Sequence, residues 1–420
     1  MYKKFQLDNG IRIIYERIPQ FKSVSIGFWF QAGSSYEKPE ENGLSHFIEH
    51  MLFKGTKKRN AKQIAEEMDS VGGQLNAFTA KEFTCLYCKI IDEHLELGLD
   101  LLSDMVLNSM FDDSELEKER GVILEEIAMY EDSPEDSVHE LLAEAFFGKH
   151  SLAKPILGST DQLLKYKRAD LVNFYNQYYT TDNFVIAVAG NFQEEQLIPL
   201  IKSRFEDWNK RGSVPSVVKE IHAESRILFK RKEIEQLHVS LSFPGLEAGN
   251  DDIYPLLVMN NMFGGSMSSR LFQKVREERG LAYSIYSYPS SYIPGGMFNI
   301  YASMKPNQSE IVLKLIMEEV EMLKKKGFTD EEFHMAREQL KGNYILNNES
   351  TGSRMNSIGK ARLMKEEIMT PSEVVSKINS IRPNDVERVI KNIFQKEHVC
   401  AALVGSEDLS EKLWNIIKCT

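Results

Sequence analysis

The chain has 420 residues, of which 42% are hydrophobic and 27% charged; this is ordinary globular usage and excludes a disordered or fibrous protein. Its formal net charge of −11 argues against a nucleic-acid-binding protein, which would present basic surface to phosphates. This length is too great for one hydrophobic core and suits two domains of about 200 residues.

The start of the chain does not resemble a secretory signal. Residues 1–5 include two lysines, but no apolar segment follows them, and residues 8–10 form a turn sequence. No apolar run approaches the roughly 18 residues of a membrane span. We therefore expect a cytoplasmic protein of bacterial type without a membrane span. The alternative is the mitochondrial matrix, if a transit peptide has been removed.

The first long helix expected along the chain carries the most informative pattern. Residues 42–55 predict this helix, with Asn42 as N-cap and Gly55 as C-terminal cap. His46 and His50 are four residues apart, so both imidazoles leave one face of the helix. Glu49 points to the same side and could take a proton from a metal-bound water. The order His-x-x-Glu-His is a zinc-peptidase signature; the alternative is an amphipathic helix with two chance histidines.

A catalytic zinc takes three protein ligands plus water, so a third ligand must come from elsewhere in the chain. The remaining histidines are scattered, and none forms a second pair. The best source of the third ligand is therefore the acidic helix expected at residues 114–127. Its apolar face is bordered by Glu126, and a carboxylate beside a buried stripe is costly unless it is paired or metal-bound. Glu119 lies seven residues earlier on nearly the same stripe. For most acids of this helix, a solvated face is the simpler interpretation.

Residues 43–56 resemble the catalytic helix of the pitrilysin/insulinase family of zinc metallopeptidases, especially its shorter-chain branch of processing peptidases. That family takes its third ligand from a glutamate about 76 residues after the second histidine, and Glu126 lies 76 residues after His50. The resemblance implies Zn²⁺ held by His46, His50 and Glu126, with Glu49 as general base. It also implies that Glu119 does not bind the metal itself but orients one of the ligand side chains.

Two further stretches resemble the family. Residues 73–79 and 84–88 look like a strand pair beside the zinc, where relatives bind substrate by strand addition; Asn76 and Ala77 match the substrate-facing positions. Arg276 and Tyr283 match a distal pair that holds the substrate carbonyl and stabilises the tetrahedral intermediate. The resemblance therefore adds a substrate strand and an oxyanion-binding pair to the predicted site.

The chain also repeats itself. Residues 183–190 resemble residues 398–405 at an offset of 215, and strands expected at 11–15 and 226–230 open the two halves at the same offset. We expect an α+β fold of two tandem homologous domains, 1–210 and 225–420, each an antiparallel-rich sheet packed with helices. The linker is placed at about 209–224. Only the first domain carries the histidine pair, and only the second carries Arg276 and Tyr283.

Acidic residues are concentrated in the first half. Residues 1–210 hold 35 acidic and 23 basic side chains, and residues 111–144 alone hold 13 acidic and two basic ones. Such a surface would attract basic peptides and repel nucleic acid. A solvated helix face explains the pattern equally well.

These features predict a zinc-dependent endopeptidase that acts on peptides or precursor segments. Because one chain carries both the zinc motif and the Arg/Tyr pair, a homodimer is favoured over a pairing with an inactive partner. The alternative is a non-catalytic peptide-binding or scaffold subunit of the same fold, in which an intact zinc motif is unusual. Precursor trimming and degradation of free peptides are equally compatible with the sequence.

Overall fold

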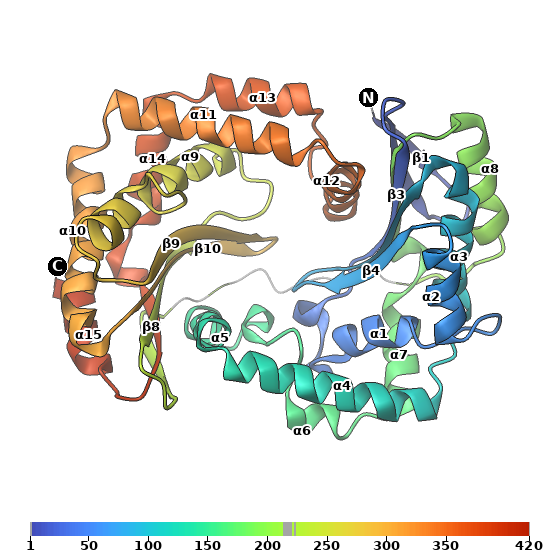
Figure 1. Cartoon of the computed structure of the whole chain (residues 1–420), viewed down its shortest axis with the longest axis horizontal. Coiled ribbons are helices and arrows are strands. Elements are labelled where there is room, and N and C mark those ends of the chain that lie inside the picture. The colour runs from blue at the N-terminus through green and yellow to red at the C-terminus, as the bar shows by residue number, and fades with distance from the viewer. Residues whose placement is uncertain (1, 213–220, 222–223, 420) are drawn as a thin grey trace. The chain divides into compact units, whose positions relative to one another are not determined.

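The protein is described by a computed structural model that covers residues 2–212, 221 and 224–419. It divides into two compact units (Figure 1). The first comprises Met1–Ile127, Lys154–Val217 and Leu346–Thr370, and the second comprises Ala128–Ala153, Val218–Ile345 and Pro371–Thr420. The tandem division into 1–210 and 225–420 expected from the sequence therefore omits an exchange of segments. Residues 128–153 of the first half belong to the second unit, and residues 346–370 of the second half belong to the first unit. Most of the predicted linker, at 213–220 and 222–223, lies outside the described residues.

The first unit contains a six-stranded sheet in the order β1-β2-β6-β3-β5-β4. All its neighbours are antiparallel except β2 and β6. The strands are β1 (Tyr2–Gln6), β2 (Arg12–Arg17), β3 (Ser23–Phe30), β4 (Gln74–Thr79), β5 (Thr84–Ile91) and β6 (Phe184–Gly190). The helices are α1 (Leu44–Leu52), α2 (Ala61–Asp69), α3 (Leu95–Asn108), α4 (Asp113–Asp132), α6 (Thr160–Leu163), α7 (Arg168–Tyr178), α8 (Glu194–Phe205) and α12 (Thr351–Met364). The last residues of α4, after Ile127, belong to the second unit.

The second unit contains a five-stranded sheet in the order β7-β11-β8-β10-β9, with β7 and β11 parallel. Its strands are β7 (Ile227–Arg231), β8 (Leu237–Gly245), β9 (Ser284–Tyr292), β10 (Gly295–Met304) and β11 (Cys400–Gly405). Its helices are α5 (Pro134–Phe147), α9 (Ile253–Phe263), α10 (Ser309–Lys326), α11 (Asp330–Asn347), α13 (Pro371–Ser380), α14 (Pro383–Ile393) and α15 (Ser410–Cys419). Apart from β1, the order repeats that of the first sheet, as expected for a duplicated α+β unit.

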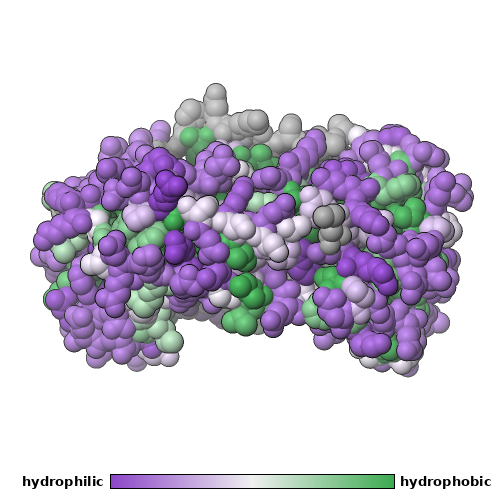
Figure 2. Space-filling view, turned by 90° about the horizontal axis from the view of Figure 1, so that it is seen from above, coloured by the Kyte–Doolittle hydropathy of each residue, from purple (hydrophilic) through white to green (hydrophobic). Residues whose placement is uncertain are grey.

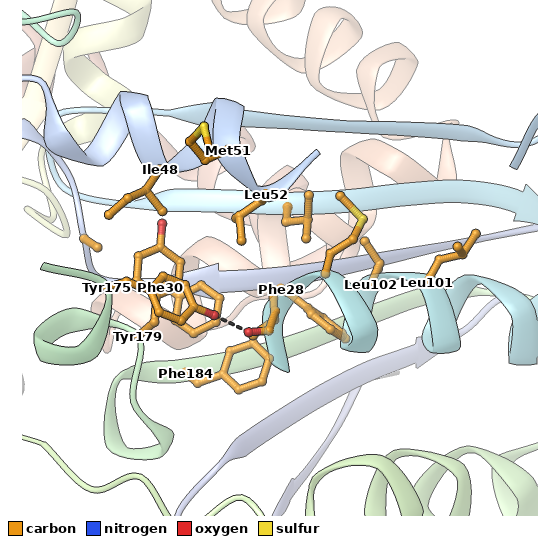
Figure 3. Close-up of a cluster of buried hydrophobic side chains, with 14 of the residues drawn as sticks. Phe28, Phe30, Ile48, Met51, Leu52, Leu101, Leu102, Tyr175, Tyr179 and Phe184 are labelled. Atoms are coloured by element: carbon orange, nitrogen blue, oxygen red, sulfur yellow. Dashed lines mark hydrogen bonds between the residues drawn. The ribbon is translucent and has the colours of Figure 1, made fainter. Parts of the chain in front are cut away.

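The central strands of each sheet are buried on both faces. In the first unit, one face packs on α1 and α3, and Figure 3 shows Ile48 and Leu52 of α1 near Phe28 and Phe30 of β3. The opposite face packs on α12 through a cluster that includes Trp29. In the second unit, α5 covers the equivalent outer face. The exchange has a physical reason, because each outer face is apolar and is covered by the helix contributed from the other half.

The α+β class predicted from the sequence is thus confirmed. None of the helices in the described part of the chain is both long enough and apolar enough to span a membrane. Figure 2 shows hydrophilic residues over most of one face of the molecule, with apolar residues in smaller groups.

Candidate metal centre

Helix α1 is fixed at its N-terminus by a buried carboxylate from the preceding turn. Glu37 accepts hydrogen bonds from the backbone N–H groups of Gly43, at 2.9 Å, and Ser45, at 2.8 Å. Asn42 is not the N-cap that the sequence suggests: the cap is Gly43, with φ of +97°, and the Asn42 side chain donates to Glu37 instead. The C-cap is Phe53 rather than Gly55. Burial raises the pKa of Glu37, and these hydrogen bonds oppose that shift.

The two histidines of α1 and one acid of α4 converge. His46 Nε2 lies 3.7 Å and His50 Nε2 lies 3.4 Å from the same Glu126 oxygen, Oε2. Burial, and then the charge of His50, lowers the pKa of His46 to about 3. His46 is therefore neutral near pH 7, with a nitrogen lone pair available, which is the form that binds metals.

The spacing of these atoms suits zinc. Ligand atoms about 2.1 Å from a tetrahedral ion lie about 3.4 Å from one another. Glu126 Oε2 lies 3.4 and 3.7 Å from the two histidine nitrogens, and all three ligand atoms lie within 4.8 Å of one another. His46, His50 and Glu126 are also the only set of three or more His, Cys, Asp or Glu residues in the described chain that could hold a metal ion. The donor set of two imidazoles and one carboxylate is one that catalytic zinc uses.

A second line of polar contacts lies behind His50. Its Nδ1 is 3.1 Å from Oε2 of Glu119, and Oε1 of Glu119 is 2.6 Å from the Lys54 ammonium. Because a carboxylate only accepts, Nδ1 carries the proton, and Nε2 is left as the ligand atom facing Glu126. Glu119 is buried, so Lys54 supplies the charge that a buried carboxylate needs.

Glu49 is half-buried and contacts the end of strand β4. Its Oε2 accepts a hydrogen bond of 2.5 Å from the Thr79 hydroxyl. Burial raises the pKa of Glu49, and the bond from Thr79 opposes that shift. Earlier in β4, Asn76 is exposed and Ala77 half-buried. Strand β4 pairs with β5 alone among the described strands, so it is an edge strand of the sheet, and the Ala77 N–H donates to the Asn76 side chain.

The second unit brings Arg276 and Tyr283 together. Arg276 lies in a π-helical segment, Phe272–Glu277, and its guanidinium is 5.9 Å from the centroid of the Tyr283 ring. Tyr283 precedes β9 and is 74% exposed, which does not fit an apolar core residue of a strand. The pair therefore presents a cation and a phenol at the surface of its unit.

Sequence reasoning missed three residues of this centre. Lys54 follows His50 by four residues on the chain, so the helical spacing that relates the two histidines could have found it. Glu37 and Thr79 come from a loop and a strand end, and their contacts with α1 have no signal in local spacing.

Comparison with known proteins places these residues in a family context. The chain matches the family "Insulinase (Peptidase family M16)" over residues 12–160 and "Peptidase M16 inactive domain" over residues 165–340. It is 44% identical to the uncharacterized zinc protease YmxG of Bacillus subtilis, covering 97% of this chain and all of that one. An uncharacterized zinc protease of Streptomyces coelicolor is 39% identical, with 93% of this chain and 87% of that one covered.

Solved structures share the fold. A protease from Helicobacter pylori superposes with a TM-score of 0.92 at 20% identity, over 96% of this chain and 99% of that one. A structure from Pseudomonas fluorescens, described as a peptidase M16 inactive domain, gives 0.90 at 18% identity, over 97% and 98%. With relatives of this identity and coverage, the chain belongs to the insulinase family of peptidases, M16.

Proposed function

We propose that this chain is a zinc-dependent endopeptidase. The observation that carries the proposal is the convergence of His46, His50 and Glu126 on one point, on the same helix as Glu49. The zinc protease names of relatives at 35–44% identity support zinc as the ion. When bound, zinc would lower the pKa of a water ligand to about 7 and polarise the scissile carbonyl.

In this proposal the residues of the chain divide the remaining work. Glu49 accepts a proton from the attacking water and later passes it to the leaving amine, as a general base and then acid. Glu119 holds the ring of His50 in the tautomer that leaves Nε2 free for the ion. Arg276 and Tyr283 hold the carbonyl oxygen as it gains negative charge.

The substrate we propose is an extended peptide. It would add to the open edge of β4, with its backbone bonding beside Asn76 and Ala77. The acidic residues of 111–144 favour basic or positively flanked peptides, with rates that fall as salt screens the attraction. We place the enzyme in the cytoplasm as a homodimer, in which Arg276 and Tyr283 come from the same chain or from its partner.

A non-catalytic peptide-binding or scaffold role is the second candidate. It is favoured by one solved neighbour, the Pseudomonas fluorescens protein described as an inactive domain. The complete set of His46, Glu49, His50 and Glu126 in this chain favours the enzyme. A neutral buried histidine grouped with a carboxylate that could bind metal is typical of a functional site, and a scaffold does not require it.

Metal analysis and peptide cleavage separate the two candidates. We expect about one zinc per chain, and cleavage of a random peptide library that a chelator abolishes. Replacing His46 or His50 by Ala, or Glu126 by Gln, should release the metal, whereas Glu49→Gln should keep it and lose activity. A zinc-free Glu49→Gln protein, or a Glu126→Gln protein with full zinc, would contradict the assigned roles.

A further inference from the structure

The carboxylate of Glu49 accepts a hydrogen bond from a hydroxyl at the end of the neighbouring strand, that of Thr79, and the backbone of the same residue also favours its charged form. Thr79 is the last residue of β4, and its Oγ1 lies 2.5 Å from Glu49 Oε2. Across the ladder Thr79 pairs with Thr84, the first residue of β5, and the two hydroxyl oxygens are 3.2 Å apart. Strand β4 also packs against α1, so the contact joins the helix that bears Glu49 to the strand edge proposed to take substrate.

Each threonine hydroxyl has one proton, and this fixes the direction of the hydrogen bonds made by Thr79 and Thr84. The buried Thr84 hydroxyl lies 2.7 Å from the carbonyl oxygen of Ala32, which can only accept, so the single proton of Thr84 is used there. The proton of Thr79 is therefore free for the Glu49 carboxylate, which also only accepts. Thr79 donates to Oε2, and Oε1 is left without that bond.

We infer that Thr79 is a positioning residue that fixes the Glu49 carboxylate by binding Oε2, so that Oε1 is the oxygen that takes the proton from the attacking water. The inference rests on the proposed function, because it requires Glu49 to act as the base. A hydrogen bond to a charged group is short and directional, and in a half-buried site it selects one carboxylate rotamer.

The side chain of Thr79 allows a clean substitution. Thr79→Val keeps the shape and the β-branching that suits a strand, and it removes only the hydroxyl. Thr79→Ser keeps the hydroxyl and removes the methyl group. Thr181→Val is a matched control, because the buried Thr181 hydroxyl donates a hydrogen bond to the backbone carbonyl of Lys210, and the residue has no role in the centre.

The kinetic signature follows from where Thr79 acts. Because a misplaced base raises the barrier without weakening substrate binding, Thr79→Val should lower kcat and kcat/KM together, by about 10- to 100-fold, with KM little changed. Zinc content should stay at the wild-type level, and the thermal midpoint should match that of Thr181→Val. Thr79→Ser should recover most of kcat. In a Glu49→Gln background, Thr79→Val should leave the residual rate unchanged.

Other outcomes would overturn the inference. Wild-type kcat in Thr79→Val, equal losses in the Val and Ser variants, or loss of zinc from Thr79→Val would each show that the hydroxyl does not act through Glu49. Failure of the proposed function looks different: either the wild type would show no cleavage that a chelator abolishes, or Glu49→Gln would retain full cleavage whatever residue stands at position 79. The same fluorogenic peptide, selected from the random library, serves for all the variants.

Discussion

The contacts behind His50 form a chain of three charged or polar groups, Lys54, Glu119 and the imidazole. The Lys54 ammonium neutralises the buried carboxylate of Glu119. That carboxylate in turn accepts the hydrogen bond that fixes which ring nitrogen of His50 carries the proton. Groups that contact the metal ligands, and not the metal, adjust the affinity of the site for zinc, whereas the ligands themselves provide most of that affinity. Their loss should therefore weaken the metal site without abolishing it.

We predict that Glu119→Gln lowers zinc affinity by about 10- to 100-fold, and that Lys54→Met lowers it by a smaller factor. Competition with a chromogenic chelator measures both. Exposed Lys58 on the same loop gives the control, since Lys58→Met removes an equal charge without touching Glu119. In the Glu119→Gln background, Lys54→Met should cost little more. Independent, additive losses would show that Lys54 does not act through Glu119.

At this scale, local spacing and tertiary contact contribute differently to the site. The separation of His46 and His50 by four residues places both imidazoles on one face, so the sequence alone predicted that pair. Glu126 was assigned through the family resemblance, because the apolar stripe of its helix leaves other acids open. Thr79 and Glu37 depend on a strand end and a loop that approach α1 only in the folded chain, and no local pattern encodes such an approach.

At the scale of elements, the helix α12 shows why the outer face of the first sheet is specific. Gly359 lies against the indole of Trp29 and the Cβ of Ala187, and an added Cβ would fall 2.4 Å from Trp29 Nε1. Gly27 of β3 meets Met355 in the same way. Glycine is needed at Gly359 for close packing, since φ is ordinary there.

A pair of glycine substitutions tests this packing. Gly359→Ala should destabilise the protein by about 1–3 kcal/mol, because neither the indole nor the strand Cβ can move freely. Gly342 in α11 has open space at its Cβ, so Gly342→Ala should stabilise by about 0.5–1 kcal/mol through helix propensity and a less flexible unfolded chain. Urea denaturation of the two variants and the wild type measures both signs. A stabilised Gly359→Ala protein would refute the tight contact.

The strands were predicted more accurately than the pairing of helices with sheets. The strand expected at 11–15 appears as β2 from Arg12, and that at 226–230 appears as β7 from Ile227. The exchange of α5 and α12 was not predicted. The apolar face of an amphipathic helix shows that the helix packs against another element, but it does not identify which of two similar sheets that element is.

At the scale of the whole molecule, the exchange makes the two halves interdependent. The outer face of the first sheet is closed by residues 346–370, and that of the second by residues 128–153. A chain cut between its two sequence repeats would leave both faces exposed. The same division separates the chemistry, since the metal centre lies in one unit and Arg276 with Tyr283 in the other.

This separation allows a test of assembly with mixed chains. We expect a dimer in solution by light scattering. Glu49→Gln chains keep Arg276, and Arg276→Ala chains keep Glu49, so each is inactive alone. If each site borrows Arg276 from its partner, half of the dimers in an equal mixture hold one complete site, and about a quarter of wild-type activity returns. Refolding the chains together, against the same chains mixed after folding, controls for exchange. An inactive co-refolded mixture would assign Arg276 to the same chain, and an active monomer would remove the dimer from the mechanism.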